Sequence, residues 1–280
     1  MRAVAIIGAG ELGGATAHLL ARRDIARSIV LIDERDKVAA GKSLDIAQAA
    51  PVEGFATQLS SYADVSAAAG ADVIVVAERA QGGEWTGEEA FALVKRLSAS
   101  APAAIIVLAG ATARETIDRS VREGTVAARR LIGSAPEALA AAARAITALA
   151  INGSPRDVAL SVLGAPPAHA VVAWEDATVG GFALTRMLDE PTRRRLTATI
   201  QAMWPPGPHA LAAAAVKTIG AIDGQSRQLV TAFVAPDAGI GARAGTAALP
   251  VRLSASGVVE VATPSLSIVE RNALDNAMML

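Results

Sequence analysis

The amino-acid sequence predicts an α/β fold in which a doubly wound parallel sheet is followed by a smaller α+β part. Three observations lead to this prediction. Short runs rich in valine and isoleucine alternate with amphipathic segments through the first half of the chain. A glycine-rich turn joins the first run to the first amphipathic segment. After about residue 150 the strand-like runs lie close together and the regular alternation ends.

The first half is predicted to form strand–helix pairs. Its first run, "RAVAIIG", is apolar without a break, which is typical of a strand buried on both faces of a parallel sheet. In the segment after it, Leu12, Ala15 and Leu19 have helical spacing, and basic residues end the pattern where they suit the helix dipole. The same reasoning predicts strands over residues 2–8, 28–33, 71–77 and 103–109, and helices over residues 11–23, 41–50, 86–100 and 113–123.

The second half is predicted to be α+β. The segment "MWPPGPH" indicates a turn between two helices, and Ser265 is the predicted N-cap of a closing amphipathic helix. The predicted strands cover residues 157–164, 169–174, 228–235 and 248–262, the last two regions being antiparallel, and the predicted helices cover residues 190–203, 209–222 and 265–280.

Composition and charge argue against several partners. The 280 residues are 52% hydrophobic, enough for one large or two smaller cores, and 26 Lys and Arg balance 27 Asp and Glu, so we expect no nucleic acid partner. The apolar stretch over residues 137–151 is interrupted by Arg144, so we expect no membrane partner. Without cysteine and with three histidines, the chain is expected to hold no metal. It enters its first strand directly after Arg2, so we expect a cytoplasmic protein.

A GxGxxG motif lies between the first predicted strand and helix. Its glycines permit a tight turn, the approach of a pyrophosphate and close packing of the helix on the strand. Asp33 ends the next strand, where a carboxylate binds ribose hydroxyls and repels a 2′-phosphate. The alternative is that the glycines only end a strand and Asp33 only caps a helix. We predict a Rossmann domain that binds NAD rather than NADP through Gly8, Gly10, Glu11, Leu12, Gly13 and Asp33.

Several longer segments carry a family resemblance. They include "AIIGAGELGGATAHLL", "LIDERDKVAAGKSLDIAQAAPVEG", "INGSPRDVALSVLG", "DATVGGFAL" and the tail from "LPVRLSASGVVEV" onward. With these segments the chain resembles the lactate/malate dehydrogenase family, and its malate dehydrogenase branch in particular, over essentially its whole length. The resemblance implies an NAD-binding Rossmann domain at residues 1–133, a C-terminal α+β substrate domain at residues 134–280, and a homodimer or homotetramer. It also implies hydride transfer between NAD and a 2-hydroxy acid.

The charged groups that this reaction needs in the family do not appear at the matching positions. The family's histidine base lies in a Gly-Gly-His-Gly or Gly-Glu-His-Gly segment, and Pro166 takes its place here. The aspartate and arginine of a Leu-Asp-Ser-Ala-Arg run fall at Leu139 and Ala142. A base and a cation for the substrate carboxylate are therefore missing from these positions.

The substrate loops differ in the same way. The family's Ala-Gly-x-Pro-Arg-Lys-Pro-Gly-Met-Ser-Arg loop corresponds to residues 78–88, "ERAQGGEWTGE", so its two arginines become Gly82 and Glu88. The Thr-Asn-Pro-Val-Asp stretch aligns with residues 109–113, which places the substrate-binding asparagine at Gly110. We therefore assign no catalytic residue.

Two of the three histidines and the new residues of the 78–88 loop stay open to alternative interpretations. His169 is a displaced base or an ordinary strand histidine, His209 belongs to a substrate pocket or caps a helix, and His18 is a residue on a helix face. Arg79, Glu84 and Trp85 form a pocket for an unknown small ligand or a contact with another protein, or they belong to a solvated loop.

Three functions are compatible with these residues. The preferred hypothesis is a family member that binds NAD but has lost the dehydrogenase chemistry, acting as a sensor, regulatory subunit or assembly partner. The second is an active NAD-dependent oxidoreductase with an altered site and a non-dicarboxylate substrate. The third is a protein that keeps the fold without the cofactor. Three charges near the expected cofactor position do not favour NAD. They belong to Glu11 in the glycine loop and to Glu78 and Arg79, where the family has Ala-Gly.

Overall fold

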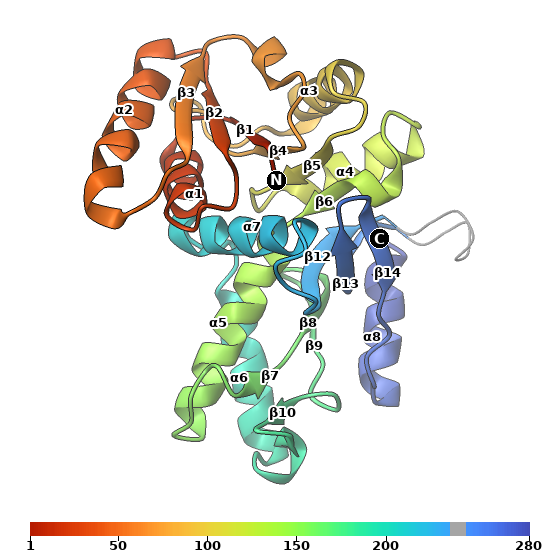
Figure 1. Ribbon diagram of the computed structural model, residues 1–280. Helices are drawn as coiled ribbons and strands as arrows, with labels where there is room; N and C mark the ends of the chain where they lie inside the picture. Colours follow the sequence, from red (N-terminus) through yellow and green to blue (C-terminus); the bar gives the residue numbers. More distant parts are fainter. Residues whose placement is uncertain (236–244) are drawn as a thin grey trace.

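The computed structural model describes residues 1–235 and 245–280 (Figure 1). In the first half, six strands run parallel in the order β3-β2-β1-β4-β5-β6. They are β1 (Ala3–Ile7), β2 (Ser28–Ile32), β3 (Gln58–Tyr62), β4 (Val73–Val76), β5 (Ile105–Leu108) and β6 (Leu131–Gly133). The predicted parallel sheet is confirmed.

Helices cover both faces of this sheet. Alternate residues of β1 explain its unbroken apolar run, because Val4 and Ile6 face one core cluster and Ala5 and Ile7 face another. The first cluster contains residues of α1 and α2, and the second contains residues of α3 and α4. These helices are α1 (Glu11–Arg22), α2 (Asp36–Glu53), α3 (Gly87–Ser100) and α4 (Ala113–Arg122), with short 3₁₀ turns η1 (Val65–Ala68) and η2 (Ala128–Arg130).

The sheet continues into the second half. Phe233 of β12 pairs antiparallel with Gly133 of β6, and β13, β8 and β9 follow in order, with β14 beside β13. These strands are β8 (Val162–Ala165), β9 (His169–Val172), β12 (Val230–Val234), β13 (Ala247–Ser254) and β14 (Gly257–Val261). A separate small sheet contains β7 (Val158–Ala159), β10 (Thr178–Val179) and β11 (Phe182–Ala183). The predicted antiparallel strands are confirmed, and one sheet of eleven strands runs through both halves of the described chain.

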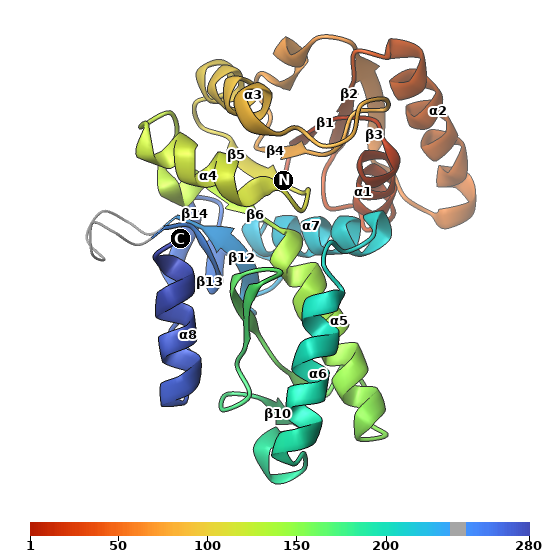
Figure 2. The same cartoon turned by 180° about the vertical axis from the view of Figure 1, so that it is seen from behind.

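The helices of the second half pack around this extension. They are α5 (Ala135–Ala150), α6 (Glu190–Ala202), α7 (Pro208–Ile222) and α8 (Ile268–Met278), with a 3₁₀ turn η3 (Leu184–Arg186). In both views α7 crosses the middle of the molecule next to α1, and α5 and α6 lie side by side (Figures 1 and 2). Among the described helices, none is long and apolar enough to span a membrane.

The predicted N-cap of the last helix was wrong. The cap of α8 is Ser267, whose hydroxyl accepts from the Glu270 N–H at 3.3 Å while the Glu270 carboxylate accepts from the Ser267 N–H at 2.8 Å. Ser265 lies two residues before this N-cap. The Ser-x-x-Glu spacing of a capping box belongs to the later serine, and this spacing was the signal in the sequence that identifies the cap.

A buried carboxylate joins three elements of the second half. The side chain of Glu137, on α5, is 2% exposed. Its Oε1 accepts from Arg144 at 2.5 Å and from Lys217 of α7 at 2.6 Å, and its Oε2 accepts from the Thr231 N–H of β12 at 2.8 Å. Two cations and a main-chain donor therefore compensate the cost of burying this charge.

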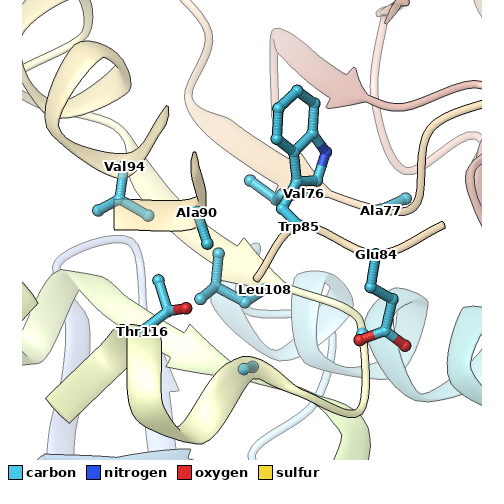
Figure 3. Close-up of a pocket in the computed structure, with 10 residues that line it drawn as sticks. Val76, Ala77, Glu84, Trp85, Ala90, Val94, Leu108 and Thr116 are labelled. Carbon is cyan, nitrogen blue, oxygen red and sulfur yellow. The ribbon is translucent and has the colours of Figure 1, made fainter. Parts of the chain in front are cut away.

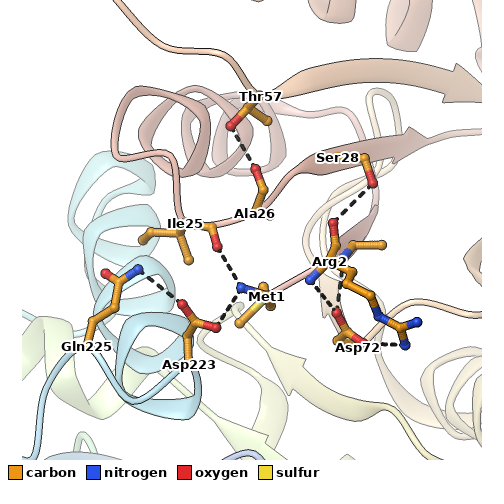
Figure 4. Close-up of polar contacts among 10 residues, drawn as sticks. Met1, Arg2, Ile25, Ala26, Ser28, Thr57, Asp72, Asp223 and Gln225 are labelled. Carbon is orange, nitrogen blue, oxygen red and sulfur yellow. Dashed lines mark hydrogen bonds and ion pairs between the residues drawn. The ribbon is translucent and has the colours of Figure 1, made fainter.

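Polar contacts also join the first strand to the end of α7. The Met1 amino group donates to Asp223 at 2.6 Å and to the Ile25 carbonyl at 3.1 Å (Figure 4). Beside it, the Asp72 carboxylate accepts from the Arg2 N–H at 2.7 Å. These contacts lie at the amino ends of the parallel strands, at the opposite edge of the sheet from the glycine-rich turn.

Candidate functional site

The glycine-rich turn lies where β1 ends and α1 begins. Gly8 has a positive φ of 105°, and a Cβ at this residue would lie 2.3 Å from the carbonyl oxygen of Glu78. A Cβ at Gly13 would lie 2.0 Å from the Gly8 carbonyl oxygen, so glycine is required there for α1 to pack closely on the turn. The turn leaves the N-terminal N–H groups of α1 at the carboxyl edge of the sheet, where anions are favoured.

Asp33 lies beside this turn, as the sequence predicted. Its carboxylate is buried and accepts from the Ala9 N–H at 2.8 Å, from the Ala80 N–H at 2.8 Å and from the Arg35 N–H at 2.9 Å. It does not form the N-cap of α2, which is Arg35. Asp33 therefore connects the glycine turn to the loop that follows β4.

Glu11 points away from the turn. It is the first residue of α1, and its Oε1 lies 3.7 Å from Nε2 of His209, at the start of α7. Both side chains are largely exposed. The N-cap of α7 is Gly207, so the interpretation of His209 as a capping residue was wrong. Leu12, the next residue of α1, contributes its side chain to the core, and its main-chain N–H donates to the Glu78 carboxylate.

The Glu78 side chain, rather than that of Glu11, lies against the glycine turn. Its Oε1 accepts from the Leu12 N–H at 2.7 Å, and a Cβ built on Gly10 would lie 2.1 Å from the same oxygen. Lys42 lies beside the turn as well, and its ammonium donates to the Gly10 carbonyl at 2.5 Å. Burial raises the pKa of the Glu78 carboxyl above its ordinary value, against the opposing effects of the Leu12 hydrogen bond and the Lys42 charge.

Residues 78 to 88, called the 78–88 loop, make contacts with one another and with the start of α3. The Arg79 N–H donates to the Gly83 carbonyl at 3.1 Å, which closes a tight turn. The Arg79 guanidinium lies 4.5 Å from the centre of the Trp85 ring and donates to Glu89 at 2.8 Å. These contacts do not match the interpretation of the segment as a freely solvated loop.

Glu84 attaches this loop to the residues that precede α4. Its Oε1 accepts from the Ala111 N–H at 3.0 Å, and its Oε2 accepts from the N–H and the hydroxyl of Thr112 at 2.9 and 2.6 Å. A Cβ on Gly110 would lie 2.5 Å from Oε2. Glu84 and Trp85 point in different directions from the loop (Figure 3). The cavity between them, Leu108 and the start of α4 measures about 20 Å³, which is room for about one water molecule.

The attachment of the loop leaves some polar atoms without a protein partner. Among the described residues, eight buried side-chain nitrogen or oxygen atoms lack one, and three of these belong to the 78–88 loop: Glu78 Oε2, Arg79 Nε and Trp85 Nε1. Each such atom costs about 1–3 kcal/mol. Strong contacts therefore hold the loop in the observed position, but three of its buried polar atoms make no hydrogen bond to the protein.

Three positions that the resemblance links to substrate chemistry, 139, 142 and 166, carry no ionisable group. Leu139 is completely buried in the apolar core between α5, α6 and the strands of the second half. Pro166 lies in the turn between β8 and β9, and Ala142 is half-buried on α5. His169 is exposed at the start of β9, paired through its main chain with Ala165, as expected for an ordinary strand histidine.

Two predictions remain, one on His18 and one on metal binding. His18 lies on the face of α1, and its Nε2 is 3.2 Å from Glu53 of α2. Within residues 1–235 and 245–280, no group of three His, Asp or Glu side chains is placed to hold a metal ion.

Comparison with known proteins gives the family. Residues 2–96 match the family model described as lactate/malate dehydrogenase, NAD binding domain. The malate dehydrogenase of Thermomicrobium roseum is 28% identical over 290 residues, which cover 98% of this chain and 94% of the relative. Residues 2–96 therefore match the NAD-binding domain of the lactate/malate dehydrogenase family, and nearly the whole chain is similar to a malate dehydrogenase. A segment of 73 residues is 47% identical to the malate dehydrogenase of Syntrophotalea carbinolica, covering 26% of this chain and 23% of that relative.

Solved structures agree with this family fold. The malate dehydrogenase from Salinibacter ruber matches with a TM-score of 0.87 at 22% identity, covering 99% of this chain and 94% of that one. The minor L-lactate dehydrogenase from Enterococcus mundtii matches with a TM-score of 0.88 at 19% identity, covering 99% and 95%. The predicted α/β fold, with a Rossmann-type parallel sheet in its first half, is the fold of this family.

NAD is the cofactor that the lactate/malate dehydrogenase family match supports. The start of α1 is the kind of group that a dinucleotide needs, and so is the Asp33 carboxylate, although here it is buried and accepts from the Ala9, Ala80 and Arg35 N–H groups. The Glu78 carboxylate is not, because it occupies the space above Gly10 and already accepts from the Leu12 N–H. With Glu78 in this position the turn does not have room for a pyrophosphate.

Proposed function

We propose that this chain is an NAD-binding member of the lactate/malate dehydrogenase family that does not oxidise 2-hydroxy acids, and that it acts as a sensor, regulatory subunit or assembly partner. The cofactor-binding residues of the proposal are Gly8, Gly10, Glu11, Leu12, Gly13 and Asp33, within a domain of residues 1–133. Residues 134–280 form the second domain, and the family resemblance supports a homodimer or homotetramer.

One observation carries the loss of chemistry. The Glu84 carboxylate fills the space beside Gly110, and the cavity that remains under the 78–88 loop has a volume of about 20 Å³. The Glu84 carboxylate takes the space that the family's asparagine side chain needs, and it is a poor neighbour for a substrate that is itself an anion. No base replaces the family histidine at Pro166, since His169 is exposed on the strand beyond it.

The proposal is tested by measuring binding and turnover on the same preparation. We expect NADH to bind at up to millimolar concentration, measured by titration calorimetry, while malate, lactate and their oxo-acids give no change in NADH absorbance above background. Turnover that is lost in a His169→Ala variant would support the altered-enzyme hypothesis instead. Light scattering measures the oligomeric state, and a monomer at assay concentration would contradict that part of the proposal.

A further inference from the structure

We propose that Glu78 is an internal anion that occupies the pyrophosphate position of the glycine turn, so that NAD enters only when the 78–88 loop releases this carboxylate. The inference rests on the proposed NAD function and adds the regulation of that site.

The first support is the contact between Glu78 and the start of α1. The N-terminal N–H groups of a helix bind phosphate oxygens through the same donors and the same positive dipole end that a carboxylate uses. The Leu12 N–H donates to Glu78 Oε1 at 2.7 Å, and the space left by the absent Gly10 side chain contains that oxygen. One donor and one space cannot serve Glu78 and a pyrophosphate at once.

The second support is the attachment of the same loop by Glu84. The alignment stated above places an asparagine at Gly110, a proline at Ala111 and a valine at Thr112. An asparagine has a Cβ where the Glu84 carboxylate now lies, a proline has no N–H, and a valine has no hydroxyl. Each of the three residues found here therefore provides the space or a donor that Glu84 uses.

The two carboxylates hold two separate points of one loop. Glu78 lies at the start of α1 and Glu84 lies before the start of α4, so the chain between them is held across the carboxyl edge of β1, β4 and β5. In the family alignment these positions carry alanine and proline, neither of which accepts a hydrogen bond through its side chain. The loop position is thus a property of this chain's own residues.

The loop is also built to be released. Glu78 Oε2, Arg79 Nε and Trp85 Nε1 are buried without a protein partner, so exposure to water satisfies groups that the observed position leaves unsatisfied. Gly82 and Gly83 have positive φ values of 117° and 77°, which gives the turn of the loop a backbone that few other residues adopt. A ligand that binds the turn more strongly than Glu78 does shifts the loop to its released position.

The test compares Glu78→Ala with Glu88→Ala. Both variants lose one negative charge from this segment, but Glu88 lies in the first turn of α3, is exposed and pairs with Arg119 rather than with the glycine turn. Binding of ADP-ribose and of adenosine is measured by titration calorimetry for wild type and both variants. ADP-ribose carries the pyrophosphate, whereas adenosine reaches only the region near Asp33.

We expect Glu78→Ala to bind ADP-ribose at least about tenfold more tightly than wild type, since like charges in one site are strongly unfavourable. Adenosine binding stays the same in all three proteins, and Glu88→Ala behaves as wild type with both ligands. Hydrogen exchange at Ala111 and Thr112 reports the release of the loop, and we expect faster exchange when ADP-ribose is bound.

The outcomes separate the two proposals. If wild type and Glu78→Ala bind ADP-ribose equally, the inference on Glu78 is wrong while the NAD function stands. If neither binds ADP-ribose or NADH at millimolar concentration, the NAD function itself is wrong. A Glu78→Gln variant, which keeps the side-chain volume and removes the charge, replaces Glu78→Ala if the latter does not fold.

Discussion

The Glu84 carboxylate accepts hydrogen bonds from both the main-chain N–H and the hydroxyl of Thr112, at 2.9 and 2.6 Å. Glu84 lies in the loop after β4, and Thr112 lies after the neighbouring strand β5. The pair therefore bridges two parallel strands at the edge of the sheet where this family binds its ligands. A side chain of the protein thus fills the space beside Gly110 at this edge.

This pair predicts an energetic coupling. Glu84→Ala removes the acceptor of three hydrogen bonds to a charged group, and we expect the free energy of unfolding in urea to fall by about 1–3 kcal/mol. Thr112→Val in that background has little further effect, because the hydroxyl has no acceptor left to lose. Glu88→Ala, which breaks an exposed ion pair, serves as the control with a change near zero. Strictly additive effects would contradict the coupling.

Glu78 predicts a dependence of stability on pH. Burial raises its pKa in the folded protein, so folding favours the protonated form. Stability is then greatest below the ordinary pKa of the carboxyl and decreases as pH rises through the raised pKa. The charged groups that act on it are Lys42 of α2 and Glu84 of the same loop. We expect Glu78→Gln to remove this decrease, so its melting temperature exceeds that of wild type at neutral pH and not at acidic pH. Parallel pH profiles for the two proteins would refute this assignment.

Glu137 predicts a large loss of stability. Glu137→Ala leaves Arg144 and Lys217 without their shared partner and the buried Thr231 N–H without an acceptor. The expected decrease in the free energy of unfolding is about 3–5 kcal/mol, measured by chemical denaturation. Glu190→Ala breaks a comparable but exposed pair with Arg194, and we expect a change below about 1 kcal/mol. Similar effects of the two substitutions would show that the buried network contributes little.

Restoring one family residue is not expected to restore the reaction. Pro166→His places a base in the turn between β8 and β9, but Leu139 offers no carboxylate to orient it and Gly82 offers no cation for the substrate. We expect malate oxidation by this variant to stay at background in a continuous NADH absorbance assay. Measurable turnover from this single change would show that the site retains more substrate-binding capacity than its side chains indicate.

The sequence predicted the architecture well where the pattern of apolar residues was strong. The runs that became β1, β2, β4 and β5 are apolar without a break because both faces of the parallel sheet are covered. The edge strand β3, "QLSSY", was missed because its residues alternate between exposed and half-buried and carry hydroxyls. The strand β6 was missed because it has only three residues.

The candidate site was harder to predict for a physical reason. The glycine turn and Asp33 have a fixed spacing along the chain, so the sequence located both. Glu78 and Glu84 act through main-chain N–H groups of Leu12 and Ala111, and such donors exist at almost every residue. Their use depends on where a distant loop comes to lie. Acidic residues at family positions for alanine and proline were the available signal.

The close contact between Glu84 and the space at Gly110 also constrains how this chain can change. An asparagine at position 110 would bring its Cβ to within 2.5 Å of the Glu84 carboxylate, so that substitution meets a clash unless Glu84 changes as well. An asparagine at position 110 would help to bind a substrate only after charged residues were also present at the other substrate positions. Single substitutions toward the family's residues therefore pass through variants that are less stable or inactive. The effect of each substitution depends on the others, which is epistasis.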